Sequence, residues 1–445
     1  MKRALLIGFQ FPPLVGTSGV QRMLRFAEHL PAYGWKPYVL TASAGAMPQT
    51  DPRTLHDIPD GVTVVRSFAL DAARHLAIGG RYWRRLAIPD RWASWIPFAV
   101  RDACRLIDRE AIDAVWTTYP IASAHRIGNW VHRLRGRPWI ADFRDPMAQD
   151  DYPSDPLLWR SFERIEREAA RRAAFLTFTS PGARDLYARR YGASFDDARF
   201  TLLMNGYDEG SFAGIEVAPP PARAPSNDAP LVLLHSGVVY PSERDPTQLF
   251  AALASLRARG AVSHRTLRLR FRASSHDAML QELAARHAVG DLIELLPPIG
   301  YRDALAEMRE ADGLLVLQAA NCNGQIPAKL YEYLRAQRPI LALADPAGDT
   351  GRLVASLGSP HVAALEDAQA IESALAGFLD AIRRGAGFVV AGERVAAFSR
   401  RRLTGELARL LDAATTGEAV TQPASAMRGS AVRAGRNASA SGPTE

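Results

Sequence analysis

The chain has 445 residues, too many for one hydrophobic core, so two domains of ordinary size are expected. Its hydrophobic (47%) and charged (23%) fractions are those of a globular protein, and no apolar run reaches the roughly 20 residues of a membrane-spanning helix. The net charge of +7 favours anionic partners, such as nucleotide phosphates or a membrane surface. Two cysteines give no disulfide framework and fit a reducing cytoplasm.

The first half, residues 1–212, alternates between strand and helix patterns, which predicts a parallel sheet covered by helices. Its apolar start ends at Gly8 without a small-residue cleavage site, so we expect a first buried strand rather than a signal peptide. The expected strands are 4–8, 37–40, 62–66, 114–117, 139–142, 175–179 and 201–204. The expected helices are 20–33, 97–109, 123–134, 157–172 and 182–191.

A Pro- and Ala-rich segment, residues 213–230, is predicted as a linker, and residues 231–390 then form a second alternating half. Its expected strands are 231–235, 267–273, 293–295, 313–317 and 340–343, with helices at 246–259 and 278–287 and from Pro327 onward. The predicted fold class is α/β: two Rossmann-like domains face each other across a cleft, with ligands at the carboxyl ends of the strands. A last helix at 391–413 precedes a small, polar tail, 414–445, that we expect to be disordered.

The helix that begins at Pro327 carries a charged pair near its N-terminus. Lys329 and Glu332 are three residues apart and share one face, whereas Leu330, Tyr333 and Leu334 form the opposite, buried face. A helix N-terminus favours phosphate, Lys329 adds a positive charge, and Glu332 can accept hydrogen bonds from ribose hydroxyls. This pattern predicts a nucleotide-sugar site, although an exposed Lys–Glu pair is the ordinary alternative. Lys329 stands out because only three of the 54 basic residues are lysines.

Two further loops follow predicted strands and precede helices. In the first, Gly16 and Gly19 allow a backbone to approach a ligand, but the loop lacks the G-x-G-x-x-G pattern of dinucleotide-binding folds. In the second, Gly237 ends a strand, and Arg244 could place its guanidinium on a diphosphate. A plain capped turn and a surface Arg244–Asp245 feature are the respective alternatives.

Polar residues also follow two strands of the first half, at the predicted cleft edge. They are Tyr119, His125, Asp142, Arg144 and Asp145. A buried structural histidine and an internal Asp–Arg ion pair are the alternatives to a role at the cleft. The chain has no Asp-x-Asp triplet and no spacing typical of metal ligands, so we expect no bound metal and no cofactor.

Residues 74–101 mix arginines with aromatic residues, a composition that suits a lipid headgroup layer. Aromatic residues in the core with arginines facing solvent would give the same composition. If these residues contact lipid, we expect a cytoplasmic protein that binds anionic lipid on the inner face of the plasma membrane.

Several motifs, in order, resemble those of bacterial family 4 glycosyltransferases, which are retaining enzymes of the GT-B fold, and most closely the branch that builds surface polysaccharides. The motifs are FPPLVGTSGVQR, WIADFRDP, FTSPGARDLY, LLMNGYD, HSGVVYPSERDP and IPAKLYEYLRAQRPIL, and the resemblance spans about residues 2–412. It implies that the second domain holds the nucleotide sugar, that the first holds the acceptor, and that the last helix crosses back onto the first domain.

The resemblance also implies roles for residues. Arg244 and Lys329 would neutralise the diphosphate, and Glu332 would hold the ribose as the second glutamate of the family's E-x7-E motif. The remaining expected donor-site positions are Gly16, Gly19, Gly237, Ile299, Asn323, Gln325 and Leu330. His125 and Asp142 would be catalytic, and Tyr119, His125, Arg144 and Asp145 would face the acceptor. The first glutamate of the motif is replaced by Gly324, which leaves the identity of the sugar open.

The sequence therefore predicts a retaining, metal-independent glycosyltransferase that moves a sugar from a nucleotide diphosphate to a glycan or polyprenyl-linked acceptor, in cell-surface polysaccharide biosynthesis. A nucleotide-sugar epimerase of the same fold would turn over the free donor without an acceptor. A non-catalytic glycan-binding protein would bind the acceptor but not the nucleotide. A nucleic-acid partner is not expected, because no basic helix or aromatic sheet motif accompanies the charge.

Overall fold

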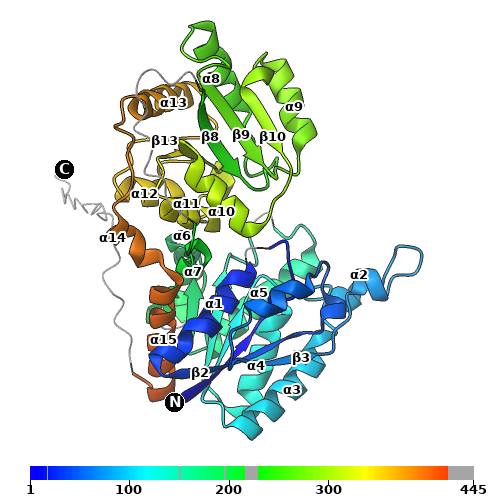
Figure 1. Cartoon of the computed structure of the whole chain (residues 1–445). Coiled ribbons are helices and arrows are strands. Elements are labelled where there is room, and N and C mark those ends of the chain that lie inside the picture. The colour runs from blue at the N-terminus through cyan, green and yellow to red at the C-terminus, as the bar shows by residue number, and fades with distance from the viewer. Residues whose placement is uncertain (18, 150–151, 195–196, 216–228, 419–445) are drawn as a thin grey trace, which may run out of the picture.

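The computed structural model describes residues 1–17, 19–149, 152–194, 197–215 and 229–418, and it has two lobes, each built on a parallel sheet with helices packed against it (Figure 1). This architecture confirms the predicted fold class. Residues 216–228 of the predicted linker and residues 419–445 of the predicted tail lie outside the described residues.

The first domain contains a seven-stranded sheet in the order β3-β2-β1-β4-β5-β6-β7. The strands are β1 (Lys2–Ile7), β2 (Trp35–Ala42), β3 (Thr63–Ser67), β4 (Ala114–Thr118), β5 (Trp139–Arg144), β6 (Phe175–Phe178) and β7 (Phe200–Leu202). The helices are α1 (Gly19–His29), α2 (Ala72–His75), α3 (Trp95–Glu110), α4 (Ser123–Arg135), α5 (Pro156–Arg172), α6 (Pro181–Tyr191) and α7 (Glu209–Phe212). The strand order reverses between β1 and β4, the position at which doubly wound sheets bind ligands.

The second domain contains a six-stranded parallel sheet in the order β10-β9-β8-β11-β12-β13, which reverses between β8 and β11. The strands are β8 (Leu231–Ser236), β9 (Leu267–Arg272), β10 (Ile293–Leu296), β11 (Gly313–Leu317), β12 (Ile340–Leu343) and β13 (Val362–Ala363). The helices are α8 (Thr247–Ala258), α9 (Asp277–Arg286), α10 (Tyr301–Glu310), α11 (Ala328–Ala336), α12 (Asp349–Ser356) and α13 (Ala368–Arg383). The predictions omitted α10, α12, α13 and the two-residue edge strand β13.

The predicted single helix at 391–413 is wrong in one respect, because it is broken. A short helix α14 (Gly392–Val395) and a 3₁₀ turn end at Ser399, whose hydroxyl caps a new helix, α15 (Arg400–Thr416). Helix α15 then runs along the first domain beside α1 (Figure 1). Its apolar residues belong to the same buried cluster as α1 and the first sheet; they are Leu403, Leu407, Ala408, Leu410, Leu411 and Ala413.

The chain crosses between the domains at one close backbone contact. Tyr207 donates its N–H to the carbonyl of Phe398, and Arg400 donates its N–H to the carbonyl of Tyr207. A Cβ on Gly206 would lie 2.1 Å from the carbonyl oxygen of Phe398, so this approach requires glycine at position 206. The crossing places the first residue of α15 between the two domains.

A second contact joins the domains directly. The Ser180 hydroxyl donates to the carbonyl oxygen of Gly324 (2.6 Å), and the Gly182 N–H donates to Oδ2 of Asp349 (2.5 Å). Both bonds link the N-terminus of α6 to loops at the carboxyl ends of strands in the second domain. Within the described residues, no helix is both long enough and apolar enough to cross a membrane.

Candidate active site

The side chain of Lys329 lies against the backbone at the end of β8. A Cβ built on Gly237 would stand 1.9 Å from Nζ of Lys329, so only glycine leaves room for the ammonium group there. Gly237 has a φ of 126°, which also favours glycine. On the same loop Arg244 donates to the carbonyl oxygen of Val238 (2.6 Å) and lies over the ring of Tyr240. The structure thus brings together the three predicted phosphate-site residues Gly237, Arg244 and Lys329.

The ammonium group of Lys329 is only partly compensated. Burial lowers its pKa to about 8; Glu332 opposes the shift, and Arg244 adds to it. His235, at the end of β8, is buried, and its pKa is lowered to about 3 by burial and by the charge of Lys329, so it is neutral at pH 7. A site with two cations, one nearby carboxylate and a neutral histidine favours a multiply charged anion.

Glu332, one helical turn beyond Lys329, is half-buried, and burial raises its pKa while Lys329 opposes the shift. Its Oε1 accepts a hydrogen bond from the hydroxyl of Tyr301 (2.9 Å). Tyr301 begins α10 and directly follows the exposed segment that contains Ile299. The carboxylate that was expected to hold a ribose therefore already accepts a hydrogen bond, from a hydroxyl two residues beyond the expected donor-site residue Ile299.

The loop before α11 is held by its own hydrogen bonds. The amide of Asn323 donates to Asp345 (2.5 Å), and the carbonyl of Gln325 accepts from Thr350 (3.1 Å). Gly324, at the position of the family's first glutamate, contacts Gly182 of the first domain. Of the predicted donor-site residues, Leu330 is fully buried in the core of the second domain, as the helical pattern predicted for its face, so its side chain does not line the site.

In the first domain, Arg144 lies at the N-terminus of α1. The β5–β6 pairing shifts register between Asp142 and Arg144, and Arg144 has a φ of 53°, a local distortion that redirects a side chain. Its Nη1 donates to Gln10 (3.1 Å) and to the carbonyl of Tyr119 (3.2 Å), and it would lie 2.6 Å from a Cβ on Gly19. The structure brings Arg144, Gly19 and Tyr119 together, whereas Gly16, with a φ of 82°, faces Gln49.

Asp142 is fully buried and forms an ion pair that sequence reasoning considered only as an alternative. Arg22 donates two hydrogen bonds to its carboxylate (2.6 and 2.8 Å), and Thr118 and Thr177 donate one each. Burial alone would raise the pKa of Asp142, but Arg22 and the two threonines lower it below its usual value. Arg22 is the last residue of the sequence GVQR, but the sequence analysis assigned it no role.

His125 is also fully buried, so its side chain does not lie on the surface of the cleft, where the sequence predicted it. Its Nδ1 lies 2.8 Å from the hydroxyl of Thr117, and its ring packs on Phe143. Burial lowers its pKa to about 4, so it is neutral at pH 7. Asp145 has a pKa raised by burial, which the guanidinium of Arg144 opposes. Tyr119 is nearly buried, and burial raises the pKa of its hydroxyl.

Sequence reasoning missed Arg400, the first residue of α15. It is 3% exposed, and its Nη1 is buried without a hydrogen-bond partner among the described residues. Burial, together with the charges of Arg22 and Arg144, lowers its pKa to about 9. No motif marked Arg400, because its position depends on where the last helix breaks.

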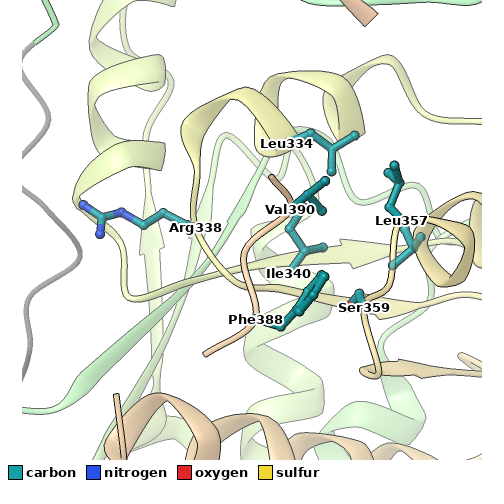
Figure 2. A pocket seen from close by; sticks show the side chains of 8 residues that line it. Leu334, Arg338, Ile340, Leu357, Ser359, Phe388 and Val390 are labelled. Carbon is teal, nitrogen blue, oxygen red and sulfur yellow. The ribbon is translucent and has the colours of Figure 1, made fainter. Parts of the chain in front are cut away.

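A small pocket in the second domain lies at the other end of α11 and is separate from this site. Figure 2 shows its apolar lining converging while the guanidinium of Arg338 points away. The apolar lining residues that the figure labels are Leu334, Ile340, Leu357, Phe388 and Val390.

Comparisons with known proteins agree with the fold. Residues 18–206 match the family of the glycosyl transferase 4-like domain. No curated protein sequence matches the chain. Sucrose-phosphate synthase from Thermosynechococcus elongatus is a similar solved structure, with 16% identity and a TM-score of 0.62 over 94% of this chain and 100% of the other.

Two further solved structures are similar over nearly the whole chain. Anabaena HepE in complex with UDP-glucose has 14% identity and a TM-score of 0.63, covering 93% of this chain and 100% of its own. Trehalose 6-phosphate synthase from Burkholderia multivorans has 13% identity and a TM-score of 0.62, covering 94% of this chain and 100% of its own. The first domain thus matches the glycosyl transferase 4-like domain, and the whole chain shares the fold of these solved structures.

Proposed function

We propose that this glycosyltransferase transfers a sugar from a nucleotide diphosphate to a glycan or polyprenyl-linked acceptor in cell-surface polysaccharide biosynthesis. The observation that carries the proposal is the position of the Lys329 ammonium against Gly237, with Arg244 on the same loop. Fixed positive charge at this point would stabilise the diphosphate as it leaves the sugar. The complex of HepE with UDP-glucose supports a nucleotide-sugar donor.

The proposed arrangement divides the two substrates between the domains. The nucleotide would lie on the second domain, with its ribose at Glu332, in place of the hydroxyl of Tyr301 that now donates to this carboxylate. The acceptor would lie beside Arg144 and Tyr119 of the first domain. We propose retention of the anomeric configuration by analogy with the family 4 enzymes that the sequence resembles.

The position of Lys329 predicts that Lys329→Arg is badly tolerated although the charge is kept. A planar, forked guanidinium is larger than an ammonium group, and the ammonium of Lys329 already lies so close to Gly237 that a Cβ there would stand 1.9 Å from it. We expect turnover to fall by about 10²-fold or more, the scale for loss of one preorganised group at a developing charge. The measurement is donor turnover together with the melting temperature.

Lys2→Arg is the matched control, because Lys2 pairs with Asp412 at the surface. It should keep both the turnover and the melting temperature of the wild type. Turnover of Lys329→Arg near that of the wild type would show that the diphosphate is held elsewhere.

We further propose that transfer needs no divalent metal. Lys329 and Arg244 would supply the positive charge that a metal gives other enzymes, and the sequence has no Asp-x-Asp triplet. One trio within the described residues, Glu28, His29 and Asp208, has metal-ligand geometry, but Arg25 pairs with Glu28 and Asp208.

Full activity is therefore expected in excess chelator after the protein has been stripped of metal, measured as release of the nucleotide diphosphate. Loss of activity that magnesium or manganese restores would refute the proposal.

The nine consecutive exposed residues 78–86 are the proposed membrane contact. They follow α2 and project from the first domain (Figure 1), with Ile78 89% and Trp83 67% exposed. Arg81 and Arg85 are exposed beside them, whereas Arg84 pairs with Asp155. The rest of the aromatic stretch belongs to the fold, because Trp95 is fully buried and Arg91 pairs with Asp71. Exposed apolar side chains beside cations that form no ion pair within the described residues suit an anionic lipid surface.

Removing this contact should weaken binding to vesicles. We expect Ile78→Ser with Trp83→Ser to abolish co-sedimentation with anionic vesicles, and Arg81→Ser with Arg85→Ser to weaken it in a salt-dependent manner. Exposed Arg402→Ser, on the first turn of α15, is a control for loss of one positive charge elsewhere. Equal binding of wild-type protein to neutral and anionic vesicles would refute the electrostatic part, and unchanged binding of both double variants would refute the contact.

A further inference from the structure

We propose that Arg400, together with Arg144, forms a second anion site between the domains, which takes a phosphate group of a substrate. This inference deepens the proposed function and depends on it only for the source of the phosphate, which is either the donor diphosphate or a phosphate on the acceptor. The site is distinct from the one at Lys329 and Arg244, because it draws its residues from the first domain and from the crossing segment.

The first observation is that Arg400 is a buried cation without an ion pair among the described residues. Its side chain is 3% exposed, its Nη1 has no hydrogen-bond partner among the described residues, and no ion pair to it occurs there. A buried charge without a partner costs several kcal/mol, so such groups are normally paired in a folded protein. An anionic ligand would supply the missing partner.

The second observation is the charge around Arg400. Arg22 donates to the carbonyls of Leu203 and Met204, just before Tyr207, whose carbonyl accepts from the N–H of Arg400. The charges of Arg22 and Arg144 both lower the pKa of Arg400. Arg22 is already neutralised by Asp142, whereas Arg144 hydrogen bonds only to the neutral acceptors Gln10 and Tyr119, and its Nε is buried without a partner in the described residues. Arg400 and Arg144 thus each keep a buried guanidinium nitrogen without a hydrogen-bond partner among the described residues, while the charge of Asp145 also acts on Arg144.

The local backbone adds to this positive potential. Arg400 is the first residue of α15, a 17-residue helix, and Arg144 lies beside Gly19 at the N-terminus of α1. Helix N-termini carry partial positive charge, so a cation there is unfavourable and an anion is favourable. The two helices and the two arginines therefore favour the same kind of ligand.

Arg400 interacts with residues of both domains. Its backbone N–H donates to the carbonyl of Tyr207 at the end of the first domain. Tyr301 and Glu332 of the second domain, which are hydrogen-bonded to each other, oppose the lowering of its pKa. A guanidinium binds phosphate oxygens through two parallel hydrogen bonds, which suits a terminal or bridging phosphate better than a sugar hydroxyl.

The test begins with inorganic phosphate, which avoids any assumption about the sugar. Thermal stability is measured against phosphate concentration for wild-type protein, Arg400→Met and the exposed control Arg402→Met. Each is also made in a Lys329→Gln background, which removes phosphate binding at the other site. We expect phosphate to bind Arg400→Met about tenfold or more weakly in both backgrounds, the loss of one charged hydrogen-bonding partner. Arg402→Met should bind as the wild type does.

Stability without ligand separates this site from a structural arginine. Replacing an unpaired buried cation by an apolar side chain of similar length should leave the melting temperature unchanged or raise it. Arg400→Lys, which keeps a cation, should retain part of the phosphate binding and serves if Arg400→Met does not fold. Phosphate binding that is the same in the Arg400 variants and in the wild type would overturn the proposal, and so would a lower melting temperature of folded Arg400→Met with phosphate binding intact.

Two further ligands identify the source of the phosphate. If the donor supplies it, Arg400→Met weakens binding of UDP but not of geranyl diphosphate, a short prenyl diphosphate; if the acceptor supplies it, the reverse holds. Either result supports the anion site, and unchanged binding of both compounds contradicts it. Failure of the proposed sugar transfer would leave the phosphate titration unaffected, so the two hypotheses fail separately.

Discussion

The proposed donor site depends on one contact, that between the Lys329 ammonium and the backbone of Gly237. It requires glycine at the end of β8, and it fixes a cation at the N-terminal end of α11. The second sheet reverses its order between β8 and β11, and the loop after β11 leads into α11. The fold thus brings the ends of these two strands side by side, and Lys329 and Arg244 give this point the positive charge that the proposed diphosphate would need.

The crossing of the chain at Gly206 and Phe398 has a comparable role for the other half of the cleft. It returns the last helix to the first domain, where α15 completes the core around α1. It also buries Arg400, the first residue of α15, with its Nη1 lacking a hydrogen-bond partner among the described residues. The chain breaks at Ser399, whose side chain caps α15, and this break therefore determines where the positive charge of Arg400 lies.

The sequence predicted both sheets, because buried parallel strands appear as short apolar runs separated by helical patterns. It predicted the buried face of α11, since Leu330, Tyr333 and Leu334 are buried. It missed α10, α12 and α13, which have no distinctive motif. The sequence could not predict the partners of buried charges either. Asp142 follows the same pattern as a cleft residue, and only the folded structure brings Arg22, 120 residues away, into contact with Asp142. The environment of His125 is likewise a property of packing, not of local sequence.

If the charged ammonium of Lys329 holds a nucleotide diphosphate, the affinity for that nucleotide must depend on pH. The pKa of Lys329 without ligand is about 8, below its usual value, so unliganded protein loses this charge above pH 8, and a bound diphosphate would raise the pKa again. Calorimetric titration with UDP, GDP, ADP and dTDP at pH 7 to 9 should find one nucleotide whose affinity falls above pH 8, approaching tenfold per pH unit. In Lys329→Gln its affinity should be low and independent of pH. Unchanged affinity from pH 7 to 9, or no binding of any of the four, would contradict the account.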